Sequence, residues 1–285
     1  MANLKEIRNR IASVSSTMQI TSAMKLVSAA KLKKAQDAIT AMRPYSDKLT
    51  SLLQALSGSI EGSNAAVYAQ EREVEKVLVV SITSNRGLCG AFNTNIIKQS
   101  IRLATETYKG ASVDVVAVGK KANDLLSKQF NVVANHSDVY DDLTFDNVSE
   151  IADQLMSDFE AGTYDKIVLV YNQFINAANQ NVMTEQFLPI VAAEAITQSA
   201  DYIFEPSKAE IVSELVPKAL KTQLYKAIRD SFASEHGARM TAMHKATDNA
   251  GELRDQLKLT YNKARQAAIT NEILEIVGGA EALSA

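Results

Sequence analysis

The chain has 285 residues, of which 46% are apolar, so it is long enough to form one or two packed domains. Its formal net charge of −3 is unevenly distributed, because residues 1–50 carry nine Lys and Arg against three Asp and Glu, whereas residues 71–205 carry ten against nineteen. The single cysteine excludes an internal disulfide and the usual cysteine-based zinc sites. No apolar run approaches the roughly 18 residues of a membrane span, and the first residues lack the apolar region of a signal peptide.

The N-terminal segment predicts one long helix. Apolar residues recur at three- and four-residue spacing from Leu4 to Met42, which is a heptad repeat, and no glycine occurs before Gly58. The heptad frame becomes polar in its middle, at Thr21 and Ser28, where a second apolar row runs beside it. We therefore expect the buried seam to shift round the helix there. The second row consists of Ile20, Ala23, Met24 and Val27.

The middle of the chain predicts a small α/β domain. Short, nearly continuous apolar runs are typical of strands buried on both faces, and they occupy residues 76–82, 113–119 and 166–172. Helical patterns lie between them at 91–108 and 147–162, so we expect a mostly parallel sheet with crossover helices. Residues 181–190 predict a further strand, antiparallel at the edge, and residues 56–70 predict a loop.

The C-terminal segment predicts a second long helix. Helical signal begins near Ser207, a heptad frame runs from Met243 to Leu274, and Gly278-Gly279 is expected to end the helix. Two heptad helices at opposite ends of one chain most simply pair as an antiparallel coiled coil, with the Rossmann-like α/β domain between them in sequence. The predicted boundaries are 1–57 for the N-terminal helix, 58–75 for a linker, 76–206 for the α/β domain and 207–285 for the C-terminal helix.

The stretch SNRGLCGAFN, Ser84–Asn93, follows the first strand and resembles a phosphate-binding turn. It lacks both the third glycine of a dinucleotide fingerprint and the lysine of a P-loop, which favours a structural turn made by Gly87 and Gly90. Cys89 has no histidine nearby in sequence, so a nucleophilic role is disfavoured. The spacing of the histidines suggests no metal site. The residues therefore predict no catalytic constellation and no cofactor. The histidines are His136, His236 and His244.

Basic residues of the N-terminal helix gather where the heptad seam becomes polar. They fit a rod that sits inside a cavity lined by acidic or apolar loops. Two other classes remain as alternatives. One is an α/β nucleotide-binding enzyme, which the missing fingerprint disfavours. The other is a coiled-coil scaffold for DNA, which the acidic middle domain disfavours. These basic residues are Lys25, Lys31, Lys33 and Lys34, and Met24 lies among them.

Three segments closely resemble the gamma subunit of F-type ATP synthase. They are IRNRIASVSSTMQITSAMKLVSAAKLKKAQ near the start, SNRGLCGAFN in the middle, and ARMTAMHKATDNAGEL with LTYNKARQAAITNEILEIVGGAEAL at the end. The resemblance implies a rotor shaft, in which the antiparallel coiled coil turns inside a hexamer of alpha and beta subunits. Proton or sodium flow through the ring of c subunits would turn the shaft and drive each beta site through its states. The family's gamma subunit performs no chemistry and binds no nucleotide.

The resemblance also assigns contacts residue by residue. It implies alpha/beta contacts at Met24, Lys25, Arg86, Arg239, Arg265, Gln266 and Thr270. It implies contacts with the c ring and the epsilon subunit in the segment DYIFEP, at Tyr202, Phe204 and Glu205. The implied partners are three alpha and three beta subunits, one epsilon subunit and the c ring, with one copy of this chain per complex and no nucleic acid.

The resemblance further implies a peripheral protein on the cytoplasmic face of a bacterial inner membrane, without a span of its own. One cysteine favours a reducing compartment, and it excludes the cysteine-pair switch of the chloroplast form of this subunit.

Overall fold

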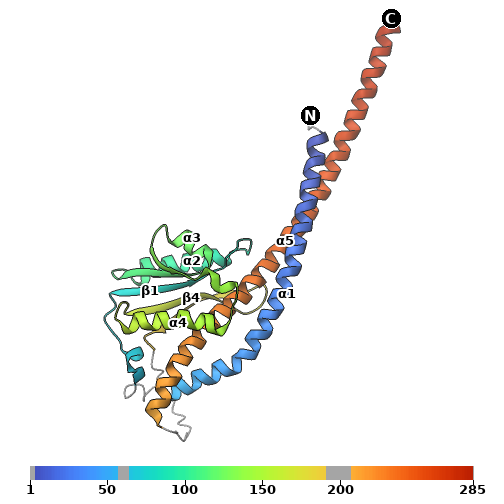
Figure 1. Cartoon of the computed structure of the whole chain (residues 1–285). Coiled ribbons are helices and arrows are strands. Elements are labelled where there is room, and N and C mark those ends of the chain that lie inside the picture. The colour runs from blue at the N-terminus through green and yellow to red at the C-terminus, as the bar shows by residue number, and fades with distance from the viewer. Residues whose placement is uncertain (1–3, 57–63, 191–206, 285) are drawn as a thin grey trace. The chain divides into compact units, whose positions relative to one another are not determined.

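The computed structural model describes residues 4–56, 64–190 and 207–284 of the chain. Its contacts divide into two compact units, each described here by itself. The first, called the helical pair, comprises Met1–Val27 and Met240–Ala285. The second, called the sheet unit, comprises Ser28–Arg239. Two long helices contribute to both units, and Figure 1 labels them α1 (Leu4–Leu56) and α5 (Lys208–Ser284).

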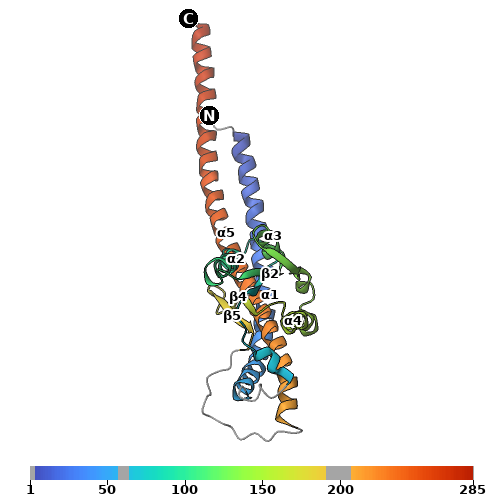
Figure 2. The same ribbon diagram turned by 90° about the vertical axis from the view of Figure 1, so that its left-hand side faces the viewer.

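In the helical pair, α1 and α5 run side by side in opposite directions (Figures 1 and 2). Arg8 Nη2 donates to Tyr261 Oη at 2.8 Å, and the hydroxyl oxygens of Thr21 and Thr247 lie 2.8 Å apart. The residue numbers rise along one helix as they fall along the other, which is the signature of antiparallel pairing. The predicted antiparallel coiled coil of the terminal helices is confirmed.

The heptad seam of α1 stays on one face through its polar middle. Thr21 is buried, whereas Ile20 and Val27 of the second apolar row are each 58% exposed. The expectation that the seam shifts to the second row is therefore wrong. The reason is that the Thr21 hydroxyl finds partners within the seam, in Thr247 and in the carbonyl of Met18, so this polar residue is buried without an unsatisfied group.

The C-terminal end of α5 extends beyond Gly278 and Gly279 and continues to Ser284. The expectation that this glycine pair ends the helix is wrong. Glycine ends a helix when it takes a left-handed conformation, and neither glycine has a positive φ. Side chains after Tyr261 are mostly exposed, so α1 buries little of this part of α5.

The sheet unit is built on a five-stranded sheet of order β3-β2-β1-β4-β5. β1 pairs in parallel with β2 and β4, β3 is parallel to β2, and β5 is antiparallel to β4. The predicted mostly parallel sheet with an antiparallel edge strand is confirmed. The strands are β1 (Lys76–Ile82), β2 (Ser112–Val118), β3 (Asn131–Asn135), β4 (Lys166–Phe174) and β5 (Gln180–Leu188).

Both faces of the sheet are covered by helices, which explains why its central strands are continuously apolar. On one face, Leu78 and Val80 of β1 pack with α4 (Phe145–Glu160) and with the first turns of α5. On the other face, Val77 and Val79 pack against α2 (Phe92–Arg102), which ends in a π-helical turn, η3 (Leu103–Thr107). Figure 1 shows α4 on one side of the sheet and α2 with α3 (Lys120–Leu126) on the other.

Four short elements are not predicted by the sequence pattern. β3 alternates between exposed and half-buried residues because it lies at the sheet edge, so it carries no apolar run. α3 has only seven residues, too few for a helical period to stand out. The stretch predicted as a loop holds a 3₁₀ helix, η2 (Asn64–Ala69), whose Tyr68 is buried in the main core. A second 3₁₀ helix, η4 (Ser137–Tyr140), follows β3.

Candidate functional site

The turn Ser84–Asn93, between β1 and α2, is held by a buried polar network. The backbone N–H of Ser84 donates to Asn93 Oδ1 at 2.9 Å, and the Asn93 amide donates to Ser84 Oγ at 2.8 Å and to Cys89 Sγ at 3.2 Å. Ser84 Oγ donates to the carbonyl of Arg86 at 2.6 Å. Ser84 and Cys89 are buried, so the network fixes the turn from beneath its surface.

The tip of this turn presents a cation and an apolar side chain to the surface. Arg86 is exposed, and Leu88 is 65% exposed with a φ of 64°, an unusual conformation for a residue with a side chain. Gly90 has a φ of 60°, which suits glycine, whereas Gly87 has no positive φ. The sequence indicates both glycines but not Leu88, because a left-handed backbone conformation at a leucine cannot be recognised from the residue type.

Arg239 lies beneath the turn rather than on the outer surface. Its side chain is only 9% exposed and forms an ion pair with Glu235, one helical turn earlier in α5, at 2.5 Å. Its Nη2 donates to the carbonyl of Arg86 at 3.1 Å and to the carbonyl of Gly87 at 3.4 Å. The structure thus brings together three of the residues singled out from the sequence, although they are about 150 positions apart in the chain.

Burial controls the ionisation of the groups round Arg239. Burial raises the pKa of Glu235, and the Arg239 guanidinium opposes that shift. Burial, followed by the charges of Arg239 and Lys31, lowers the pKa of His236 to about 3, so His236 is neutral at physiological pH. Burial also raises the pKa of the Cys89 thiol, which keeps it protonated and disfavours a nucleophilic role.

α5 covers the carboxyl ends of β1 and β4, where the strand order of an open α/β sheet diverges. Such sheets bind nucleotides in the crevice at that point. Here Ser234 Oγ donates to the carbonyl of Asn172 in β4 at 3.0 Å, and Asn172 Nδ2 donates to the carbonyl of Phe92 at 3.2 Å. A Cβ on Gly237 would lie 3.2 Å from Ala177 Cα, so the helix backbone itself lies against the loop after β4. The crevice is filled by the chain's own helix.

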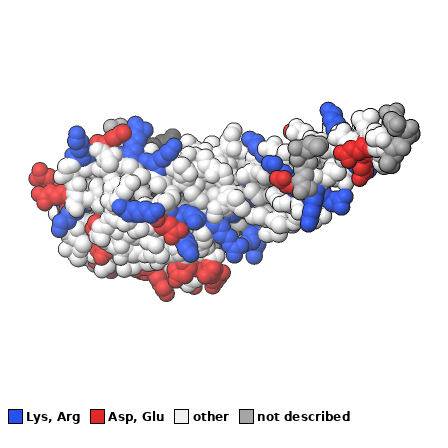
Figure 3. Space-filling model, turned by 90° about the horizontal axis from the view of Figure 1, so that it is seen from above, with Lys and Arg blue, Asp and Glu red and all other residues white. Residues whose placement is uncertain are grey.

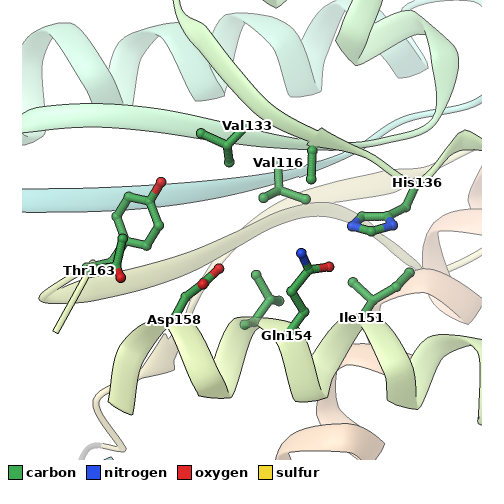
Figure 4. Close-up of a pocket in the computed structure, with 10 residues that line it drawn as sticks. Val116, Val133, His136, Ile151, Gln154, Asp158 and Thr163 are labelled. Carbon is green, nitrogen blue, oxygen red and sulfur yellow. The ribbon is translucent and has the colours of Figure 1, made fainter. Parts of the chain in front are cut away.

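A small cleft of about 190 Å³ opens between α4 and the strands β2 and β3 (Figure 4). Gln154 and Asp158 extend from α4 towards the sheet, and His136 follows β3. The side chains that line it include Asp158 but neither lysine nor arginine, so nothing in this lining would neutralise a phosphate. The lining residues are Val116, Val133, Ala134, His136, Ile151, Gln154, Leu155, Asp158, Thr163 and Tyr164.

The other sequence-predicted contact residues lie along the helical pair. Met24 and Lys25 of α1 are half-buried. Arg265, Gln266 and Thr270 are exposed on α5, beyond Tyr261. They are far along the helices from Met24, so the structure does not bring the two groups together. Tyr202, Phe204 and Glu205 lie outside the described residues.

Charged side chains on the surface form separate groups rather than one basic stripe on the face shown in Figure 3. Among residues 4–56, 64–190 and 207–284, no three His, Cys, Asp or Glu side chains gather closely enough to hold a metal ion. Within the same ranges, no helix combines the length and apolar content needed to cross a bilayer.

Comparisons with known proteins agree along the whole chain. A sequence model of the family described as ATP synthase matches residues 3–283. A protein of Flavobacterium johnsoniae named ATP synthase gamma chain is 71% identical over 286 residues and covers 100% of both chains. The ATP synthase gamma chain of Flavobacterium psychrophilum is 70% identical over 285 residues and covers 99% of both.

Solved structures with a similar fold come from mitochondrial ATP synthases. One chain, from the central stalk and c ring of the Tetrahymena thermophila enzyme, has a TM-score of 0.60 and 25% identity, covering 80% of this chain and 99% of that one. Another, from the Euglena gracilis enzyme, has a TM-score of 0.72 at 23% identity and covers 98% of this chain and 94% of that one. The second likeness concerns the fold alone.

Proposed function

The chain belongs to the family of ATP synthase gamma chains, and from that membership we propose that it turns as the shaft of its complex, coupling ion flow through a c ring to conformational change at the beta subunits. It is a non-catalytic subunit, the central stalk of an F-type ATP synthase. The observation that carries the proposal is identity of 70% or more over nearly the full length of two gamma chains.

The end of α5 supports a shaft that is surrounded by other subunits. Beyond Tyr261 its large apolar side chains are exposed, with Ile273 54%, Leu274 62% and Ile276 70% exposed. A helix whose large apolar side chains are exposed in its own chain gains stability when a partner covers them. The cavity of a hexamer of three alpha and three beta subunits would provide that cover.

We propose that Arg265, Gln266 and Thr270 meet loops of the alpha and beta subunits on this part of α5, and that Met24 and Lys25 of α1 meet an acidic segment of beta. Exposed ion pairs and hydrogen bonds of this kind contribute only about 0.2–1 kcal/mol each. Weak contacts suit a shaft that must turn without locking. Arg86, at the tip of the Ser84–Asn93 turn, is a further contact.

At the opposite end of the complex, the segment with Tyr202, Phe204 and Glu205 is proposed to contact the c ring and the epsilon subunit. The complex would then stand on the cytoplasmic face of a bacterial inner membrane, with this chain as a peripheral subunit present in one copy. The Tetrahymena thermophila structure, which is of the central stalk and c ring, supports such an arrangement.

Reconstitution tests the proposal. The full chain alone should hydrolyse no ATP, and alpha and beta subunits assembled with it, epsilon, the c ring and the stator subunits in vesicles should make ATP when an ion gradient is applied. Leaving this chain out should abolish coupled synthesis. Normal coupled synthesis without it would falsify the rotor function. Binding of ATP or NAD by the isolated chain would instead support the nucleotide-binding alternative, which the filling of the crevice by α5 disfavours.

A further inference from the structure

The ion pair between Glu235 and Arg239 is unusual because it is almost wholly inside the sheet unit. The two side chains are 10% and 9% exposed, whereas the pair Arg102–Glu106, with the same residue types and spacing, is 67% and 66% exposed. A buried pair needs further hydrogen bonds to offset the loss of water around its charges. Those bonds go to the carbonyls of Arg86 and Gly87, which belong to the turn.

The hydrogen bonds from Arg239 go to the backbone of the turn and not to its side chains. Its guanidinium contacts the backbone of Arg86 and leaves the Arg86 side chain exposed. The neighbouring Leu88 is held with a φ of 64°, a conformation that costs energy and persists only where its surroundings enforce it. Arg239 and Asn93 both lie beneath the same turn and supply that constraint from below.

We propose that Arg239 is a positioning residue: held by Glu235, it fixes the backbone of the Ser84–Asn93 turn so that the side chains of Arg86 and Leu88 are presented to a neighbouring subunit in one arrangement. In this reading Arg239 acts through the turn and does not itself contact the partner. The part of this inference that concerns a neighbouring subunit rests on the proposed function, whereas the part that concerns the turn does not.

Cys89 reports on the turn directly. It is the only cysteine of the chain, it is 1% exposed, and it accepts a hydrogen bond from Asn93 within the turn. In the full chain, the rate at which Cys89 reacts with an aromatic disulfide reagent therefore measures opening of the turn. Arg239→Gln should raise this rate roughly tenfold, since it removes the charged donor beneath two carbonyls. Arg102→Gln, the matched exposed control, should leave it within about twofold.

Local opening must be separated from loss of the whole fold. Amide hydrogen exchange of Arg239→Gln should rise in residues 84–93 and stay at the native rate in β1. Arg239→Lys keeps the charge but loses the forked donor, so it should restore only part of the native labelling rate. An unchanged Cys89 rate in Arg239→Gln, or an equal rise of exchange in β1, would overturn the positioning role.

The assembled complex tests whether the turn presents Arg86 and Leu88 to a neighbouring subunit. Arg86→Gln and Arg239→Gln should each lower the number of ions pumped per ATP hydrolysed, and the double variant should be no worse than the worse single one, because both act on one contact. Additive losses would show that Arg239 has its own contact and would overturn the proposal. If the native complex neither pumps nor synthesises, the rotor function fails, and the labelling result still decides the role of Arg239 in the turn.

Discussion

His236 shows how one buried residue links the stability of this fold to pH. Its side chain stacks edge-on against Phe232, with ring centroids 4.5 Å apart, and Nε2 is buried without a hydrogen-bond partner in the part of the chain that the structure describes. The nearby charges are Arg239, Lys31 and the buried carboxyl of Glu235. Protonating this imidazole in the folded chain is therefore costly.

The sign of the pH effect follows from the lowered pKa. Between the ordinary value of 6.5 and about 3, the unfolded chain binds a proton at His236 and the folded chain does not. The free energy of unfolding should therefore fall as pH drops below 6.5, by up to about 1.4 kcal/mol per pH unit for one proton. Urea unfolding at pH 7, 6 and 5 would measure it. His236→Gln should reduce this slope, leaving the part due to His136, whose pKa burial also lowers, and the exposed His244→Gln should not change it. Equal slopes for His236→Gln and the native chain would contradict this account.

At the residue scale, the individual members of the turn could be predicted but their supporting partners could not. The glycines and the cysteine of Ser84–Asn93 stand out in the sequence by type. The role of Glu235 beside Arg239 could be suspected from their spacing of four on a helix. That both lie under a turn about 150 residues earlier depends on how α5 crosses the sheet, which no local pattern reports.

Two glycines inside α5 allow a matched test of how closely the helix packs. A Cβ at Gly237 would lie 3.2 Å from Ala177 Cα, whereas one at Gly251 would have only Met18 Sδ near it, at 4.0 Å. Gly251→Ala should raise the free energy of unfolding by about 0.5–1 kcal/mol through helix propensity. In Gly237→Ala the added methyl group would crowd the backbone of Ala177 and cancel this stabilisation. Its free energy of unfolding should be at least about 1 kcal/mol lower than that of Gly251→Ala.

Thermal unfolding of the two variants, followed by helical circular dichroism, would compare them directly. Gly278→Ala provides a third position, where nothing lies within 4 Å. If all three alanine variants are stabilised equally, α5 does not pack closely on the loop after β4.

At the element scale, what could be predicted depended on burial. β1 and β4 are buried on both faces and carry continuous apolar runs, so their positions were evident. β3 at the edge and the short α3 carry no such run, and they were missed. The sequence predicts the wrong seam in the middle of α1, because a polar residue such as Thr21 is not expected to be buried. Its hydrogen bond to Thr247, on the other helix, is what allows it to be buried.

At the scale of the whole molecule, the heptads at both ends predict the antiparallel pair, whereas the resemblance to the gamma-subunit family indicates which exposed residues meet a partner. Arg265 and Gln266 are exposed and make no contact on which the isolated fold depends. Arg265→Ala and Gln266→Ala should therefore change the free energy of unfolding of the full chain by less than about 0.5 kcal/mol. In the assembled complex each should lower turnover about twofold to fivefold, the effect of losing a contact of up to about 1 kcal/mol.

Lys263→Ala, an exposed neighbour outside the proposed contacts, is the matched control for steady-state ATP hydrolysis and ion pumping. Turnover and coupling that match those of Lys263→Ala would show that the assigned contacts are wrong for this chain.

The filling of the sheet crevice by α5 has a consequence for how firmly the sheet can hold that helix. A nucleotide in such a crevice is exchangeable, so its occupancy rises and falls with its concentration and with competitors. The segment containing Ser234 and Gly237 belongs to the same polypeptide, which gives it a fixed effective concentration at the sheet. It cannot be diluted or displaced by a metabolite. In related sheets the occupancy of the crevice depends on the supply of a ligand. Here the attachment of α5 to the sheet does not depend on the nucleotide concentration of the cell.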